Sequence, residues 1–424
     1  MLLIAAFLAC GILSTAFGQE GQKLLQVLPS TVEQLEFLRY DLASKYEVDF
    51  WGPTAVDEPS FVSVNADVAA KVEAVLKQHQ IDVKVVFDDI TNLFDEGHAR
   101  LAHNRKFQKG DDPRTITLDE YHSHSEINDF LDETAATYPD IASVQSIGQS
   151  FEGRDMKLIK LGVPGDNKKA VFIGAGIHAR EWIAPAVVVY FIHAMTTQFE
   201  TNDRINELMR AVDVYVLPSV NPDGYDYTRS SSGRRLWRKT RSGPHEGSSC
   251  KGVDPNRNFP FQWGGQGTSG YPCSDIYRGP EPASEVEVRN LVAFLDDNKD
   301  AIKVYIATHS YSQVWLVPFG YQSPSVYPDD YDDLLDLGER CVAAIRQVHG
   351  TRFRAGNSND LLGAAAGAAD DQAKSMGIKY AYTLELRPSG GFGGFELPER
   401  YIIPSGEEIL PAYLLTMEAA RDAP

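Results

Sequence analysis

A histidine and a glutamate lie three residues apart in this sequence, directly after a strongly apolar segment. His178 and Glu181 follow residues 170–176, which are apolar or small and predict a buried strand. A second histidine, His309, directly follows another apolar stretch, residues 304–308, which predicts a strand. A catalytic zinc ion uses three protein ligands and keeps one position open for water, so these side chains could share one ion. Taken alone, the His-x-x-Glu pattern is common, and a single histidine beside a strand is more often a core residue.

Longer stretches around these residues resemble the metallocarboxypeptidases related to carboxypeptidases A and B. The resembling segments are 178–183 (HAREWI), 221–225 (NPDGY), 235–239 (RLWRK), 252–258 (GVDPNRN), 309–313 (HSYSQ) and 383–387 (TLELR). They keep the family's order over about 210 residues, and residues 19–109 resemble the family's activation domain. The resemblance implies an α/β fold, with a mixed eight-stranded sheet flanked by helices, after a small α+β ferredoxin-like prodomain.

The resemblance also implies roles for the reacting groups. His178, Glu181 and His309 match the ligands of one zinc ion per chain. Asp254 matches the residue that accepts a hydrogen bond from the far nitrogen of His178 and so fixes its tautomer. Glu385 matches the general base that takes a proton from water and passes it to the leaving amine. The alternative for Glu385 is a structural ion pair.

Other matching residues are those that hold a peptide. Asn256 and Arg257 match the clamp for a free C-terminal carboxylate, which the planar fork of arginine binds in a bidentate manner. Arg238 matches the arginine that stabilises the oxyanion, although residues 234–239 alone would be interpreted as a basic surface turn. The outer subsites are matched by Arg180 and Tyr311.

One acidic residue bears on specificity. Asp370 matches the carboxylate at the base of the pocket in B-type enzymes, and Asp370 with Asp371 matches their aspartate pair. A buried carboxylate needs a partner, which a Lys or Arg of the substrate supplies. We therefore expect release of C-terminal Lys or Arg. If Asp370 lay on an exposed acidic loop instead, an A-type enzyme acting on apolar or aromatic ends would be favoured.

Two residues depart from the family pattern. Gly363 stands where these enzymes usually carry a tyrosine on a mobile loop, and Gln372 stands where they usually carry a tryptophan. The predicted ligands, clamp and base are all present, so the departure concerns how the loop closes over a substrate. It also leaves open a secreted, non-catalytic relative that binds peptides or a proteinaceous inhibitor.

Regular elements must position these residues, and apolar segments of the chain predict them. Further buried strands are predicted at 212–217, 303–308, 314–317 and 380–386, and a helix with Pro185 near its start follows the segment 170–176. Alternating strands and helices predict an α/β domain. In the first part of the chain, strands are predicted at 22–29, 48–51, 60–64 and 82–87, and helices at 31–43, with Ser30 as N-cap and Glu33 in the capping box, and at 67–78.

The N-terminal segment and the net charge of the chain indicate where the protein acts. Residues 1–18 resemble a secretory signal peptide, with a buried N-terminal helix as the alternative. No later apolar run approaches the ~20 residues of a membrane helix. The net charge of −19 argues against nucleic acid as a partner. We expect a secreted, extracellular monomer that acts on peptide or protein C-termini.

The chain is expected to be made as a precursor. Residues 19–109 form the predicted prodomain, and 110–424 form the catalytic domain. The stretch 100–109 is rich in Lys and Arg, so a trypsin-like activating protease could cut it, although it could also be an uncut connector.

Cysteine usage fits the same compartment. Loss of the signal peptide removes Cys10 and leaves three cysteines. Cys250 and Cys273 are expected to form a disulfide, and Cys341 is expected to be a buried thiol.

Overall fold

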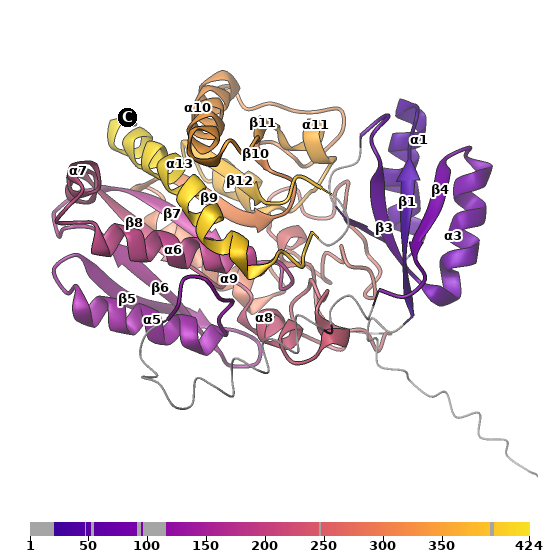
Figure 1. Cartoon of the computed structure of the whole chain (residues 1–424), viewed down its shortest axis with the longest axis horizontal. Coiled ribbons are helices and arrows are strands. Elements are labelled where there is room, and N and C mark those ends of the chain that lie inside the picture. Colours follow the sequence, from indigo (N-terminus) through magenta and orange to yellow (C-terminus); the bar gives the residue numbers. More distant parts are fainter. Residues whose placement is uncertain are drawn as a thin grey trace, which may run out of the picture.

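The computed structural model of the chain describes residues 21–46, 48–51, 55–90, 95, 116–245, 247–390 and 394–424. The predicted signal peptide and the basic stretch 100–109 lie outside these residues. Two units lie side by side: a small one, up to residue 90 and indigo to purple in Figure 1, and a larger one from residue 116 onward.

The small unit is a four-stranded antiparallel sheet with helices against it. Its elements are β1 (Gln22–Leu28), α1 (Val32–Glu36), the π-helical turn η1 (Phe37–Leu42), α2 (Ala43–Lys45), β2 (Val48–Trp51), β3 (Ser60–Asn65), α3 (Ala66–Gln78) and β4 (Asp82–Phe87). The strand order is β2-β3-β1-β4, and helices follow β1 and β3. This is the ferredoxin-like βαββαβ arrangement that the resemblance implied.

The two faces of this small sheet pack against different partners. Leu25 and Val27 of β1 join the core beneath the helices of the same unit. Leu24, which points the other way, packs with Trp51 and with residues of the larger unit. Because side chains alternate along a strand, one strand serves both the core of the small unit and its interface with the larger unit.

The first helix begins one residue later than expected. Thr31, not Ser30, is the N-cap, and its hydroxyl accepts a hydrogen bond from the backbone N–H of Gln34 at 3.2 Å. The Gln34 side chain reaches back to the N–H of Ser30 at 2.7 Å. The expected box of Ser30 and Glu33 is therefore wrong, because Thr31 and Gln34 offer the same spacing one residue on.

The larger unit is built on a mixed eight-stranded sheet. Its strands are β5 (Ala142–Gln149), β6 (Asp155–Leu161), β7 (Lys169–Ala175), β8 (Val212–Leu217), β9 (Ile302–Ser310), β10 (Val314–Val317), β11 (Arg354–Asn357) and β12 (Tyr380–Leu386), in the order β11-β10-β12-β9-β7-β8-β6-β5. The central strands β12, β9, β7 and β8 are parallel. The strands β10, β6 and β5 introduce the antiparallel pairs. The predicted α/β fold is confirmed.

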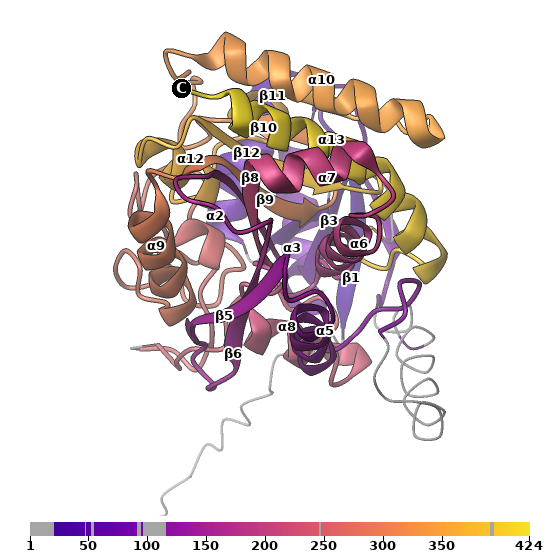
Figure 2. The ribbon, with the colours of Figure 1, turned by 90° about the vertical axis from the view of Figure 1, so that its left-hand side faces the viewer.

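Helices cover both faces of this sheet, as Figures 1 and 2 show from two sides. On one face pack α5 (His124–Thr137), α6 (Ile183–Thr197), α7 (Asp203–Ala211), α10 (Tyr331–His349) and α13 (Ile402–Asp422). On the other pack α9 (Val286–Asn298) and α12 (Ala369–Ser375). The shorter α8 (Pro222–Thr228) and α11 (Ser358–Leu362) lie in connections. None of the described helices is long and apolar enough to cross a membrane.

Strand β7 shows why the central strands are apolar throughout. Val171 and Ile173 enter the core under α6 and α13, whereas Ala170 and Phe172 enter the core on the opposite face. Parallel strands covered on both faces need apolar side chains at every position. Their carboxyl ends then meet at one edge of the sheet, where such folds place their sites.

Candidate metal centre and active site

Three predicted ligands meet at the carboxyl ends of β7 and β9. His178 and Glu181 lie in the turn between β7 and α6, and His309 is the penultimate residue of β9. The two strands are parallel neighbours, with Ala175 opposite Thr308. The expectation that His309 follows its strand needs a small correction, because the strand runs on to Ser310.

The ligand atoms converge on one point. Glu181 Oε1 lies 2.8 Å from His178 Nδ1, and Glu181 Oε2 lies 3.0 Å from His309 Nδ1. The two Nδ1 atoms are 3.1 Å apart, and the three ligand atoms all lie within 4.8 Å of one another. All three side chains are buried. Two imidazole nitrogens and one carboxylate, aimed at one another in a buried position, are a donor set that fits zinc.

The charges of Glu181 and His178 agree with this arrangement, whereas burial would lower the pKa of His309 but Glu181 outweighs burial and raises it. Burial alone would raise the pKa of Glu181, but the two histidines outweigh it and lower that pKa. Burial lowers the pKa of His178, with the Arg238 cation acting in the same direction. A neutral imidazole beside an ionised carboxylate is the protonation state that a metal ligand needs.

Asp254 supports the centre from behind. Its Oδ1 lies 3.2 Å from His178 Nε2, so a proton shared there leaves Nδ1 of His178 with its lone pair facing the other ligands. Asp254 Oδ2 accepts two hydrogen bonds from Arg238, at 3.0 and 2.8 Å. Burial would raise the pKa of Asp254, but Arg238 and His178 hold it well below its usual value.

Glu385 lies beside the centre on the next strand. It is paired with His309 in the register of β12 and β9, and it lines the cleft. Its Oε2 has no hydrogen-bond partner among the described residues. Burial is the largest cause that raises the pKa of Glu385 to about 7, and Glu181 adds to it while His309 opposes it. A carboxyl group with a pKa near neutrality can both accept and donate a proton.

A cavity of about 250 Å³ joins these groups to the other predicted residues. Nine of the ten predicted site residues line it: His178, Arg180, Glu181, Arg238, Asn256, Arg257, Tyr311, Asp370 and Glu385. The tenth, His309, is fully buried behind His178 and Glu181. The sequence therefore located the walls of this cavity from segments up to about 200 residues apart.

The predicted clamp is tied into the wall of the cavity. Arg257 donates hydrogen bonds from Nε to the carbonyl of Gly267 and from Nη1 to the carbonyl of Asn256, both at 2.8 Å. Asn256 Oδ1 accepts a hydrogen bond from the N–H of Ala369 at 2.9 Å. Burial lowers the pKa of Arg257, with Asp254 opposing it. These hydrogen bonds hold the Arg257 guanidinium and the Asn256 side-chain amide near the start of α12.

Asp370 lies in the first turn of α12 and faces the cavity. Only 3 % of its surface is exposed, and burial raises its pKa. The neighbouring Asp371 has a different role, because it accepts hydrogen bonds from the N–H of Gly320 at 2.9 and 3.1 Å. The described structure thus does not place Asp370 on an exposed acidic loop. Gln372 accepts a hydrogen bond from the N–H of Phe261 and so ties the loop around Phe261 to α12.

The small unit closes the cavity on its open side. Asp49 of β2 accepts two hydrogen bonds from Arg180, at 2.6 and 2.8 Å. Trp51 packs edge-on against Phe395, which packs in the same way against Tyr311. Sequence reasoning missed Asp49 and Trp51 as functional residues. An acidic residue inside a four-residue strand was the signal that could have drawn attention to Asp49.

Gly363, the departure from the family pattern, lies beneath the small unit. It ends α11 with φ +94° and ψ 166°, a conformation almost confined to glycine. A Cβ there would lie 3.2 Å from Cδ of Arg39, which comes from η1. The absence of a side chain at Gly363 therefore leaves space that Arg39 occupies.

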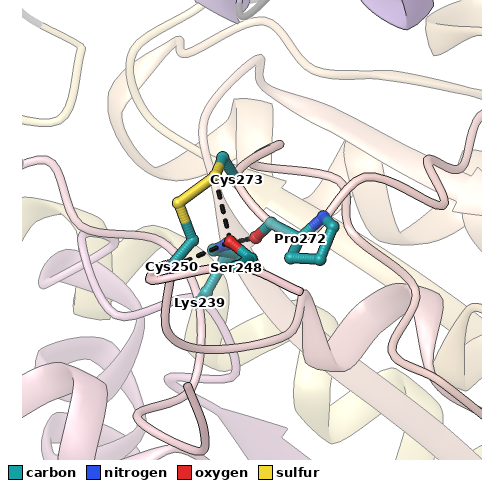
Figure 3. Close-up of a disulfide and its surroundings, with 5 residues drawn as sticks. All are labelled: Lys239, Ser248, Cys250, Pro272 and Cys273. Carbon is teal, nitrogen blue, oxygen red and sulfur yellow. Dashed lines mark hydrogen bonds between the residues drawn. A yellow bond between two sulfur atoms is a disulfide. The ribbon is translucent and has the colours of Figure 1, made fainter. Parts of the chain in front are cut away.

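The predicted disulfide is confirmed (Figure 3), and its Cys273 comes two residues before Asp275, which lines the cavity. Cys250 and Cys273 are bonded, and Lys239 Nζ donates to the carbonyl of Pro272 at 2.7 Å beside them. Cys341 is free and buried in α10, as expected, and burial raises its pKa. The disulfide anchors the loop that ends at the cavity wall.

Comparison with known proteins agrees with this geometry. Residues 127–412 match a family model described as zinc carboxypeptidase, and residues 25–97 match one described as carboxypeptidase activation peptide. The chain is 48 % identical to carboxypeptidase B of Astacus astacus over 303 residues, covering 71 % of this chain and 97 % of that protein. It is 35 % identical to carboxypeptidase A2 of Rattus norvegicus over 425 residues, covering 100 % and 99 %.

A solved structure is also similar. Bovine thrombin-activatable fibrinolysis inhibitor, in complex with tick carboxypeptidase inhibitor, superimposes with a TM-score of 0.66 at 38 % sequence identity. The match covers 72 % of this chain and 98 % of that one.

Proposed function

This chain belongs to the zinc carboxypeptidase family and carries the family's activation peptide, and from that premise we propose that it releases C-terminal Lys or Arg from peptides once its prodomain has been removed. The observation that carries the specificity is Asp370, a buried carboxylate facing the same cavity as Glu385 and the metal ligands. A basic side chain of the substrate supplies the cation that this carboxylate lacks.

The metal chemistry belongs to His178, Glu181 and His309. The zinc ion that they would hold, one per chain, supplies a Lewis acid for the scissile carbonyl and for the attacking water. Asp254 keeps the proton of His178 on Nε2, away from the centre. Glu385 takes the proton of the attacking water on its unpaired Oε2 and delivers it to the leaving nitrogen.

The peptide is held by donors around the centre. Arg257 and the amide of Asn256 bind the free carboxylate, which restricts cleavage to the last peptide bond. Arg238, held by its two bonds to Asp254, stabilises the charge that develops on the carbonyl oxygen. Arg180 and Tyr311, farther along the cavity, contact the preceding residues of the substrate.

The prodomain blocks binding of a substrate in the precursor, because Asp49 accepts the hydrogen bonds of the Arg180 guanidinium. We propose that a trypsin-like protease cuts the basic stretch 100–109 and so frees the cleft. Residues 1–18 would direct the chain to secretion, and the mature enzyme would act as a monomer. A proteinaceous inhibitor is a further proposed partner, since the structure of the bovine relative is a complex with one.

The experiment offers matched peptides ending in Lys and in Phe to precursor that has been treated briefly with trypsin. Released amino acids are measured with and without a zinc chelator, and bound zinc is counted. Chelator-sensitive release of Lys supports the proposal. Release of Phe alone would keep the chemistry but overturn the role of Asp370. Zinc-loaded, cleaved protein that releases neither would favour a non-catalytic, peptide-binding relative.

A further inference from the structure

Arg180 lies between two carboxylates from different units of the chain. On one side, Asp49 of the prodomain accepts two hydrogen bonds from it, at 2.6 and 2.8 Å. On the other side, Asp275 Oδ2 lies 3.8 Å from Nη1, close enough for an ion pair but too far for a hydrogen bond. Only 2 % of Arg180 is exposed, and its Nε has no hydrogen-bond partner among the described residues.

Asp275 belongs to the peptidase unit and is held at the rim of the cavity. It lies two residues after Cys273, whose disulfide to Cys250 anchors this loop (Figure 3). On its other side, the carbonyl of Tyr277 accepts a hydrogen bond from the N–H of Asp254 at 2.8 Å. Asp275 therefore stays beside Arg180 when the prodomain departs.

The Asp275 carboxylate has room to move. Of its side-chain surface, 38 % is accessible, and within the described part of the chain no hydrogen bond to it is found. The Arg180 guanidinium has two contacts within the larger unit: it lies 4.2 Å from the centre of the Phe395 ring and donates a hydrogen bond to the carbonyl of Leu236 at 3.4 Å. Closing the gap of 3.8 Å to a hydrogen bond thus requires a movement of about 1 Å by Asp275.

Loss of Asp49 would remove the two hydrogen bonds that the Arg180 guanidinium makes to a carboxylate. Asp275 is the one other carboxylate within 4 Å of Arg180 among the residues that the structure describes. We propose that Asp275 forms a hydrogen-bonded ion pair with Arg180 in place of Asp49 when the prodomain leaves. Asp275 then positions Arg180 for the substrate. This inference rests on the proposed function, since it assigns Arg180 to substrate binding.

The exchange has two opposite consequences. In the precursor, Asp275 competes with Asp49 for one cation, and their like charges repel, so Asp275 weakens the hold of the prodomain. Burial and the nearby Asp49 raise the pKa of Asp275 there, which is consistent with this repulsion. In the mature enzyme, the same carboxylate holds Arg180 in place. Removing the charge of Asp275 should therefore strengthen the docking of the prodomain in the precursor but weaken the binding of long substrates to the mature enzyme.

The first test uses the intact precursor and needs no activity. Hydrogen exchange is followed at the backbone amides of β2 (Val48–Trp51), which report opening of the prodomain. In Asp275→Asn, exchange should slow by about three- to tenfold, as expected for loss of one close charge–charge contact. In Asp49→Asn it should become faster. Glu281→Gln, an exposed carboxylate in the same region of the chain, is the control and should match wild type.

The second test uses the cleaved enzyme. For peptides long enough to reach Arg180, Asp275→Asn should raise KM about three- to tenfold with little change in kcat. A substrate with one residue before the scissile bond should be affected less than twofold. Asp275→Glu should restore the longer substrates. A purely structural role of the loop would instead loosen the prodomain and impair short and long substrates alike.

The outcomes separate this inference from the proposed function. If cleaved wild-type protein releases no amino acid, the proposed function fails, and the exchange measurement still tests whether the two carboxylates compete. If wild type is active but Asp275→Asn behaves like Glu281→Gln in both tests, the takeover of Arg180 by Asp275 is overturned.

Discussion

Four carboxylates meet around the cleft, and the residues beside each one set its charge. Glu181 and Asp254 lie against histidine or arginine, and their pKa values are lowered despite burial. Asp370 and Glu385 are dominated by burial, and their pKa values are raised, that of Glu385 to about 7. Carboxylates with pKa values driven apart in one site can divide ligand, acid–base and recognition roles among them.

The role of Asp370 can be tested by removing its charge. In Asp370→Ala, kcat/KM for a peptide ending in Lys or Arg should fall by about 100-fold or more, because a buried cation loses its partner. Peptides with apolar ends should be affected far less. The matched control is Asp371→Asn, which weakens the bond to the N–H of Gly320 and should affect all substrates to a similar degree. Equal losses on all substrates in Asp370→Ala would contradict the proposed pocket.

Glu287 of α9 predicts a dependence of stability on pH. Glu287 is fully buried. Its Oε1 accepts a hydrogen bond from the N–H of Phe151 at 2.9 Å, and its Oε2 has no hydrogen-bond partner in the described structure. Burial is the main cause that raises its pKa from 4.5 to about 7. Since the folded protein binds this proton more tightly than the unfolded one, stability falls as pH rises from 4.5 and the loss is complete above 7. The loss is about 3 kcal/mol.

The variant Glu287→Gln stays uncharged and should keep that stability. Its unfolding midpoint should match wild type at pH 4 and exceed it at pH 8, measured by thermal or urea unfolding. Glu281→Gln, an exposed carboxylate near the start of α9, should follow wild type at both pH values. A Glu287→Gln midpoint that falls with pH as steeply as wild type would mean that Glu287 is ionised without cost.

Among the elements, the sequence predicted the buried central strands best. The predicted strands at 212–217, 314–317 and 380–386 coincide with β8, β10 and β12. These strands are apolar throughout because both faces are covered. The edge strand β5 has one buried residue in eight, so its sequence lacks that signal. The end of α11 could not be foreseen either, since it depends on contact with a helix about 320 residues earlier.

The backbone conformation of Gly363, at the end of α11, predicts that a side chain there destabilises the protein. Its φ of +94° with ψ of 166° disfavours any residue with a Cβ, so Gly363→Ala should lower the free energy of unfolding by about 1–3 kcal/mol. Adding Arg39→Ala should recover only the part due to the 3.2 Å contact. Gly233→Ala is the control, because Gly233 has no positive φ and open space around its Cβ position. A precursor as stable as this control would show that the loop adopts another conformation.

At the scale of the whole molecule, two units share one apolar cluster. Leu24, Trp51 and Ile90 of the small unit pack with Leu236, Tyr311 and Phe395 of the larger one. Each of these residues could belong to the core of its own unit, so the sequence alone gives no sign that they meet. The local pattern therefore predicts both folds but not the interface between them. The hydrogen bonds that the Asp49 carboxylate accepts from Arg180 and from Trp51 complete it.

Trp51 joins both parts of this interface, which makes it the position whose loss should open the precursor. It is 2 % exposed, packs against Phe395, and donates a hydrogen bond from Nε1 to Asp49 Oδ2 at 2.8 Å. Truncation of a buried tryptophan costs about 3–5 kcal/mol, here largely from the docked state. The uncleaved Trp51→Ala precursor should therefore hydrolyse a short peptide many times faster than wild type, measured as a fraction of the activity after full cleavage.

The alternative cause of such a rise is an unfolded prodomain, and hydrogen exchange in α3 (Ala66–Gln78) distinguishes it. That helix packs on the prodomain's own core through Val72 and Leu76, away from Trp51. Trp51→Ala should leave its protection intact, whereas Leu76→Ala should remove it. Val32→Ala, at an exposed site on the same unit, should change neither measurement. If Trp51→Ala stays as inactive as Val32→Ala before cleavage, the pair formed by Asp49 and Arg180 is sufficient to keep the cleft closed.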